Sequence, residues 1–110
     1  MGVGYLDCAS FRKTLDMLVI AFCSDYTARK RLIEAGECTR RTVMEYKYLN
    51  GIILEAAEEV VGRYAETYID EIGKSVGYAY SEVDDISETT YKKIKREVKI
   101  NIARRLHLID

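Results

Sequence analysis

The chain has 110 residues, of which 48% are hydrophobic and 32% are charged, and its formal net charge at pH 7 is −1. This length matches one domain, and this composition excludes an intrinsically disordered chain. Proline, the strongest helix breaker, is absent. We therefore expect an all-α protein, with residues 1–110 forming a single-domain bundle of about four to six helices.

Residues 10–36 are predicted to form two helices. In the first, apolar residues recur at three- and four-residue spacing behind the candidate N-cap Ser10: Phe11, Leu15, Leu18, Val19 and Phe22. The second runs from about residue 26 to residue 35, and its buried candidates are Leu32 and Ile33. Gly36 is the natural C-terminal stop of this second helix.

A longer helical segment is predicted over residues 39–73, opening at Thr39 and ending at Gly73. Apolar and aromatic residues keep to one face of it: Val43, Leu49, Ile52, Ile53, Ala56, Val60, Tyr64, Tyr68 and Ile72. Gly51 and Gly62 lie inside the segment, and each costs a helix about 1 kcal/mol relative to alanine. The segment is therefore either two helices or one bent helix.

Residues 74–85 are predicted to be a loop, with or without a short extended piece. The last helix, 87–107, begins at Ser87, because Ile86 and Tyr91 stand at the two positions of a hydrophobic staple around that cap. Its apolar stripe consists of Tyr91, Ile94, Val98, Ile102 and Leu106.

The small net charge hides a strong segregation along the chain. Residues 26–50 hold six basic and three acidic residues, and residues 51–88 hold two basic and ten acidic residues. Residues 89–110 hold seven basic and two acidic residues, a net charge of +5. A polyanion would be repelled by the middle segment and attracted by the last one.

The last helix carries polar and cationic residues on the side opposite its apolar stripe. At 100° per residue, Thr89, Lys92, Lys93 and Arg96 point away from the stripe, and Lys99 lies on the flank. A helix that enters the major groove offers short polar side chains to base edges and cations to phosphates. The other interpretation is a solvated basic face on an ordinary surface helix.

These residues also resemble a family. The run from Ile86-Ser87 through Tyr91-Lys92-Lys93, closing with Ile102-Ala103 and Leu106, looks like the recognition helix of sigma-factor-like helix-turn-helix regulators in phages and mobile elements. Residues 68–73 resemble the supporting helix of that motif, although the connection to Ile86 is longer than the family's turn of three or four residues. The resemblance covers about the last forty residues. It implies DNA binding by Ser87, Thr89, Lys92, Lys93 and Arg96 in a phage or prophage transcriptional regulator.

A second basic patch lies upstream, on either side of the turn at Gly36. A helix, an Ala-Gly turn and a polar-basic second helix are also the order of a repressor-type helix-turn-helix. The cations of this patch are Arg29, Lys30, Arg31, Arg40 and Arg41. They either form a DNA-binding motif of their own or contact phosphates beside the C-terminal helix.

The alternative function is a non-catalytic, homodimerising protein–protein interaction module, whose acidic middle and basic ends pair across the dimer. We find no catalytic constellation, and we expect no enzyme activity, no cofactor and no metal site. The three cysteines (Cys8, Cys23 and Cys38) and the single histidine, His107, lack metal-ligand spacing, and the acidic residues Glu55, Glu59, Glu66 and Asp70 share a predicted helix face without histidines. The expected partners are DNA and either a second copy or another protein.

The apolar run 17–23 is too short to span a bilayer, which needs about twenty residues. No small-residue cleavage site follows it, so a signal peptide is not expected. The unpaired cysteines are interpreted as reduced thiols that act as small hydrophobic residues. Together these features predict a cytoplasmic protein without a membrane segment.

Overall fold

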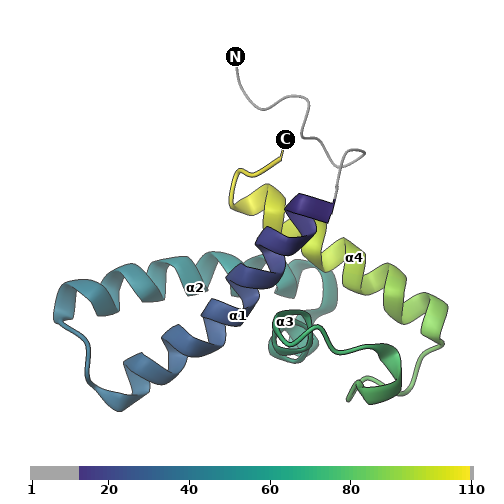
Figure 1. The fold of residues 1–110 in the computed structure, drawn as a ribbon, viewed down its shortest axis with the longest axis horizontal. Coiled ribbons are helices and arrows are strands. Elements are labelled where there is room, and N and C mark those ends of the chain that lie inside the picture. Colours follow the sequence, from purple (N-terminus) through teal and green to yellow (C-terminus); the bar gives the residue numbers. More distant parts are fainter. Residues whose placement is uncertain (1–12, 110) are drawn as a thin grey trace.

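A computed structural model of the chain describes residues 13–109, which form four α-helices joined by turns (Figure 1). Helix α1 spans Lys13–Ala35, α2 Arg40–Val61, α3 Ala65–Gly73 and α4 Glu88–Arg105. Short 3-10 turns lie at Gly62–Tyr64 and Tyr78–Tyr80. No strand occurs among the described residues, which confirms the all-α prediction. None of the described helices is long and apolar enough to cross a membrane.

Helix α1 is continuous, and the prediction of two helices over residues 10–36 is wrong. Its buried residues Leu15, Val19, Cys23 and Tyr26 follow one another at four- and three-residue spacing, straight through the point where a break was expected. No glycine or proline stands there to end the helix. The described part of this region therefore holds one helix where two were predicted. Ser10 and Phe11 lie outside the described residues.

Helix α1 ends where the sequence predicts. Gly36 adopts a positive φ of 70°, a conformation that glycine takes at little cost, and its amide donates to the Ile33 carbonyl oxygen at 3.1 Å. The prediction that Leu32 and Ile33 are buried is not fulfilled, because Leu32 is exposed and Ile33 is half-buried. Both lie at the tip of the α1–α2 hairpin, where the two helices project beyond the core (Figure 1).

The segment 39–73 is two helices, one of the two forms that the sequence left open. Thr39 caps α2, with its hydroxyl oxygen accepting from the Thr42 amide at 3.2 Å. Gly51 lies within α2, whereas Gly62 has a positive φ of 57° and ends it. The apolar stripe is consequently interrupted at Tyr64, which is exposed.

The core lies where all four helices meet. Helix α2 packs against α4 and α1 against α3, and the side chains between them are fully buried: Val19, Cys23, Ile53, Ile69, Ile72, Val98 and Ile102. In Figure 1, α3 is seen almost along its axis while α4 lies across the view, so the two helices cross steeply. The molecule is flat, with extents of 42 × 42 × 21 Å. Most of α4 therefore has one face on the core and one face on the surface.

Candidate nucleic-acid interface

Helix α4 begins as the sequence predicts. Ser87 is its N-cap, and the Ser87 hydroxyl oxygen accepts from the Thr90 amide at 3.2 Å. Tyr91 is 1% exposed and Ile86 packs against the core, which places both residues of the predicted staple on the inner side. The start of the helix is thus determined by capping and by burial together.

The side of α4 that faces away from the core carries most of the predicted DNA-binding residues. Ser87, Thr89, Lys92, Lys93 and Arg96 are all exposed. The opposite side of the helix is fully buried at Val98 and Ile102. Lys92 forms an i,i+4 ion pair with Glu88 at 2.9 Å, an exposed contact of the kind that contributes about 0.3–0.5 kcal/mol. We call this surface, made by Ser87, Thr89, Lys92, Lys93 and Arg96, the α4 face.

Lys99 does not belong to the α4 face, and its prediction as a DNA-binding residue is not supported. Its side chain is only 17% exposed, and its Nζ lies 2.8 Å from Asp16 Oδ1. Asp16 is on α1, so this ion pair joins α1 to α4. On the helical wheel Lys99 is a flanking residue, and the flank is the part of the helix that α1 covers.

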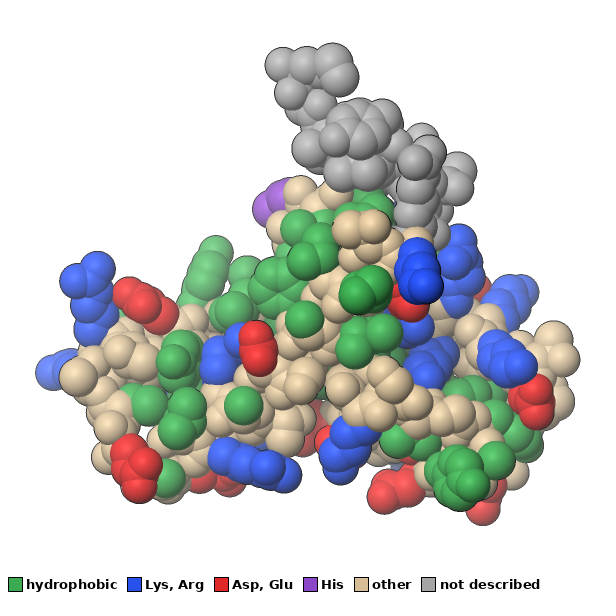
Figure 2. All heavy atoms as spheres, in the orientation of Figure 1, with side chains coloured by type: hydrophobic (Ala, Val, Ile, Leu, Met, Phe, Trp, Pro, Cys, Tyr) green, Lys and Arg blue, Asp and Glu red, His purple; other side chains and the backbone are tan. Residues whose placement is uncertain are grey.

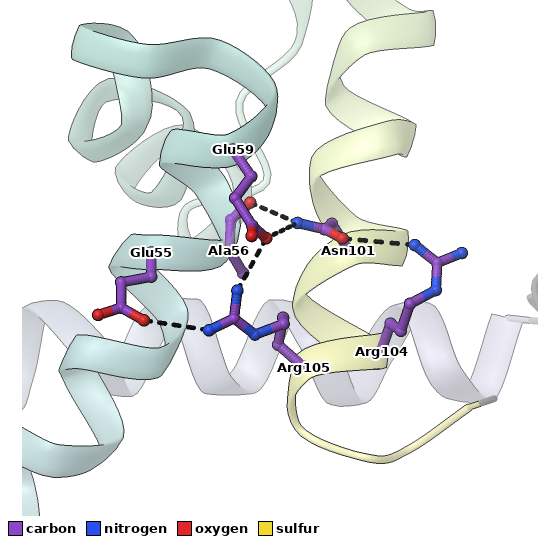
Figure 3. Close-up of polar contacts among 6 residues, drawn as sticks. All are labelled: Glu55, Ala56, Glu59, Asn101, Arg104 and Arg105. Atoms are coloured by element: carbon purple, nitrogen blue, oxygen red, sulfur yellow. Dashed lines mark hydrogen bonds and ion pairs between the residues drawn. The ribbon is translucent and has the colours of Figure 1, made fainter.

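The C-terminal half of α4 is attached to α2 by a cluster of polar contacts (Figure 3). Asn101 Nδ2 donates to the Ala56 carbonyl oxygen at 2.7 Å and to Glu59 Oε1 at 2.8 Å. Arg105 pairs with Glu59 at 2.9 Å and with Glu55 at 3.0 Å. The hydrogen bond from Asn101 and the Arg105 guanidinium lower the pKa of Glu59, so that carboxylate stays charged at neutral pH. The C-terminal half of α4 is therefore anchored to α2.

The connection between α3 and α4 is long, and a buried carboxylate holds it in place. Glu71, on α3, is 4% exposed and accepts three hydrogen bonds. The donors are the Tyr91 hydroxyl at 2.7 Å, the Ser81 hydroxyl at 2.6 Å and the Glu82 amide at 2.8 Å. A buried carboxylate is stable only with such partners, because burial removes its water. The network thus ties α3, the connection and the first turn of α4 to one another.

Tyrosine rings and a lysine complete the packing of this connection. The Tyr91 ring stacks on Tyr68, with centroids 5.8 Å apart, and meets Tyr78 at 5.6 Å. The Tyr78 hydroxyl donates to the Ile86 carbonyl oxygen at 2.6 Å. Lys95 Nζ donates to the Val76 carbonyl oxygen at 2.6 Å, and burial lowers the pKa of Lys95. Sequence analysis missed these roles, although Lys95 and Tyr91 stand at i,i+4 spacing, where their side chains meet.

The second basic patch is not a single surface. Arg29 is 8% exposed, and its Nε donates to Asn50 Oδ1 at 2.7 Å, so it connects α1 to α2. Lys30 pairs with Glu66 on α3 at 2.8 Å. Arg31, Arg40 and Arg41 are exposed near the hairpin tip, and Arg41 pairs with Glu45. Three of the five predicted cations therefore have partners within the fold, and two of these, Arg29 and Lys30, join α1 to another helix.

The acidic residues of the middle segment do not share one face. Glu55 and Glu59 lie on α2, whereas Glu66 and Asp70 lie on α3, because the break at Gly62 separates the two pairs. Over residues 13–109 no group of three or more His, Cys, Asp or Glu side chains is arranged to hold a metal ion. Cys8 lies outside the described residues.

Comparison with known proteins identifies no relative: no protein family, no curated protein and no solved structure matches this chain. What the protein does is therefore inferred from the residues of its own surface. The resemblance of the C-terminal forty residues to sigma-factor-like regulators stays a prediction.

Proposed function

We propose that this chain is a small DNA-binding protein that reads duplex DNA with the α4 face and regulates transcription. The observation that carries the proposal is the division of α4 into two sides. The inner side is buried on the other three helices, and the outer side presents Thr89, Lys92, Lys93 and Arg96 to solvent. A helix of this kind can enter the major groove without disturbing its own core.

The surroundings of α4 also support the proposal. Its first turns are fixed by the Glu71 network, and its last turns are fixed by Asn101 and Arg105. A fixed helix loses little conformational entropy when it binds, so more of the contact energy appears as affinity. The steep crossing of α3 and α4 is compatible with a supporting helix beneath a reading helix (Figure 1).

The proposal is tested by fluorescence anisotropy with mixed-sequence duplex DNA at low and moderate salt. The test variant is Lys92→Ala/Lys93→Ala/Arg96→Ala. Removing three phosphate-neutralising cations is expected to weaken binding strongly. The association constant K falls as salt rises, and the substitutions should make the negative slope of log K against log salt shallower by up to about 3. All three residues are exposed, so circular dichroism should show an unchanged fold.

The matched control is Arg31→Ala/Arg40→Ala/Arg41→Ala, which removes the same charge from the hairpin tip. These residues are also exposed, and they lie away from α4. Retained binding in the control and lost binding in the test variant would support the α4 face. Loss only in the control would move the DNA site to the second basic patch. A folded wild-type protein that binds no duplex at low salt would refute DNA binding altogether.

The alternative function, a homodimerising interaction module, has one specific observation in its favour. Three large apolar side chains are exposed around the α1–α2 hairpin tip: Leu32 at 40%, Met44 at 66% and Tyr48 at 75%. The acidic middle and the basic end of the chain were expected to pair across such a dimer. Some of these ion pairs form within one chain instead, since Arg105 pairs with Glu55 and Glu59. Light scattering after size exclusion would detect a dimer, and Met44→Ser/Tyr48→Ser should dissociate it if the tip is the interface.

A further inference from the structure

Helix α2 carries a line of exposed side chains on the side that faces away from the core. Arg41, Tyr48 and Glu55 follow one another at intervals of seven residues, which is about two helical turns, so they lie along one side of the helix. Met44 stands between the first two. Tyr48 is 75% exposed and Met44 is 66% exposed, whereas Ile53 on the opposite side is fully buried. We call the line formed by Arg41, Met44, Tyr48 and Glu55 the α2 stripe.

The apolar middle of the α2 stripe lies toward the hairpin tip, where α1 and α2 project beyond the core (Figure 1). In Figure 2, hydrophobic side chains project from the edge that α2 forms, next to charged side chains at the hairpin end. Tyrosine and methionine are enriched at protein–protein interfaces, and a tyrosine that becomes buried there often carries much of the binding energy. The composition of the stripe therefore favours a protein partner.

The two halves of α2 have opposite charge. The first half, residues 40–50, holds three basic residues and one acidic residue, a net charge of +2. The second half, residues 51–61, holds three acidic residues and no basic residue, a net charge of −3. Arg105 of α4 pairs with Glu55 and Glu59 and reduces the charge of the second half to −2. The halves thus keep charges of opposite sign after the ion pairs within one chain are counted.

Charged side chains on both halves are accessible to a partner. Arg41 pairs with Glu45, but the Arg41 side chain is 90% exposed, and exposed i,i+4 pairs of this kind are weak. The Glu55 side chain stays 65% exposed beside its partner on α4. Arg40 and Glu58 are exposed, and neither forms an ion pair with a described residue. Each half of α2 therefore offers charge to a second chain.

We propose that α2 pairs antiparallel with α2 of a second copy of this chain, about a two-fold axis at Tyr48. The two Tyr48 rings then meet at the axis. Arg41 of each copy lies opposite Glu55 of the other, because both residues are about 10 Å from Tyr48 along the helix. A parallel pair would place like charges together instead. A two-fold contact uses the same surface on both chains and is the commonest form of dimer. This inference goes beyond DNA binding and does not depend on it.

Sedimentation equilibrium of the full chain from about 1 µM to about 1 mM covers the range of weak interfaces. The wild type is expected to dimerise in that range. Tyr48→Ser should weaken the dimer at least about tenfold, because a tyrosine at the centre of an interface is a typical hot spot. The matched control is Tyr80→Ser, since Tyr80 is 85% exposed in the turn between α3 and α4, and it should dimerise as the wild type does. A monomeric wild type, or equal losses in the two variants, would overturn the proposal.

Charge reversal tests the antiparallel pairing itself. Arg40→Glu/Arg41→Glu makes the first half of α2 acidic, and Glu55→Lys/Glu58→Lys makes the second half basic. All four residues are exposed, so circular dichroism should show folded variants. Each variant alone should dimerise at least about tenfold more weakly than the wild type, because the facing halves then have charges of the same sign.

An equimolar mixture of the two charge variants should dimerise again, since every half of α2 then faces a half of opposite charge. Added salt should weaken the wild-type dimer, because it screens the attraction between the halves. Single variants that dimerise as the wild type does, or a mixture that stays monomeric, would overturn the pairing. A wild-type dimer that salt strengthens would overturn the antiparallel orientation, because like charges would then be in contact.

Discussion

Helix α3 approaches the backbone of α1 closely at Gly73, and adding one methyl group there should be costly. A Cβ built on Gly73 would lie 2.8 Å from the Ser24 nitrogen and 2.9 Å from the Cys23 carbonyl carbon. Both are backbone atoms in the middle of α1, so no side chain can rotate away to relieve the clash. Gly73→Ala therefore requires α1 to move away from α3.

The expected magnitude combines two opposing terms. Overpacking in a close-packed interior typically costs about 1–3 kcal/mol. Alanine gains up to about 1 kcal/mol over glycine within a helix, and less than that here, because Gly73 is the last residue of α3. We expect Gly73→Ala to lower the free energy of unfolding by about 1–2 kcal/mol. For a chain of this size each kcal/mol corresponds to a fall in Tm of about 4–8 °C.

Gly51→Ala is the matched control. Gly51 lies inside α2, and a Cβ built there would have no heavy atom within 4 Å beyond its chain neighbours and the backbone of its own helix. This substitution is expected to raise stability by about 0.5–1 kcal/mol through helix propensity alone. Urea titrations and thermal melts followed by circular dichroism would measure both changes. If Gly73→Ala is as stable as the wild type while Gly51→Ala is stabilised, the close contact of α3 with α1 is refuted.

Two buried side chains and one half-buried amide give further expectations. Burial and the hydrogen bond to Glu71 raise the pKa of Tyr91 from 10.0 to about 12, so the neutral phenol is favoured in the folded state and stability is lost as the pH rises from about 10 to about 12. Urea titrations across that range should show a smaller loss for Tyr91→Phe, and equal losses would contradict the assignment. Burial also raises the pKa of Cys23 to about 12. Iodoacetamide should therefore modify the half-buried Cys38 in the native protein and Cys23 only after unfolding. Peptide mass spectra that show labelling of Cys23 in the native protein would contradict this. Asn50 forms hydrogen bonds with both the Tyr26 carbonyl oxygen and Arg29. Asn50→Ala should lower the free energy of unfolding, measured by urea titration, by about 1–3 kcal/mol. An unchanged urea midpoint would show that these hydrogen bonds do not contribute to stability.

Most of the secondary structure could be predicted, because its signals are local. The caps at Thr39 and Ser87 and the helix ends at Gly36 and Gly73 each depend on residues within about one turn. The error in α1 has the same origin. The expected break near residue 24 rested on the grouping of apolar residues, although no helix-ending residue stands there.

The candidate site was predictable only as a helix face. The wheel of α4 distinguishes the inner stripe from Lys92, Lys93 and Arg96, because the core side of an amphipathic helix is encoded by spacing. The wheel could not distinguish a flanking cation that binds DNA from one that binds another helix. Lys99 is of the second kind, since Asp16 of α1 lies 2.8 Å away.

The sequence alone therefore determined that the chain is helical, where most helices begin and end, and which side of α4 is polar. Tertiary structure alone decided that Arg29 is buried, that Lys99 is paired and that Glu71 holds the turn beneath Tyr80. The physical reason is the range of the interactions. Caps and periodicity act within a few residues, whereas the partner of a charged side chain depends on which distant helix packs against it.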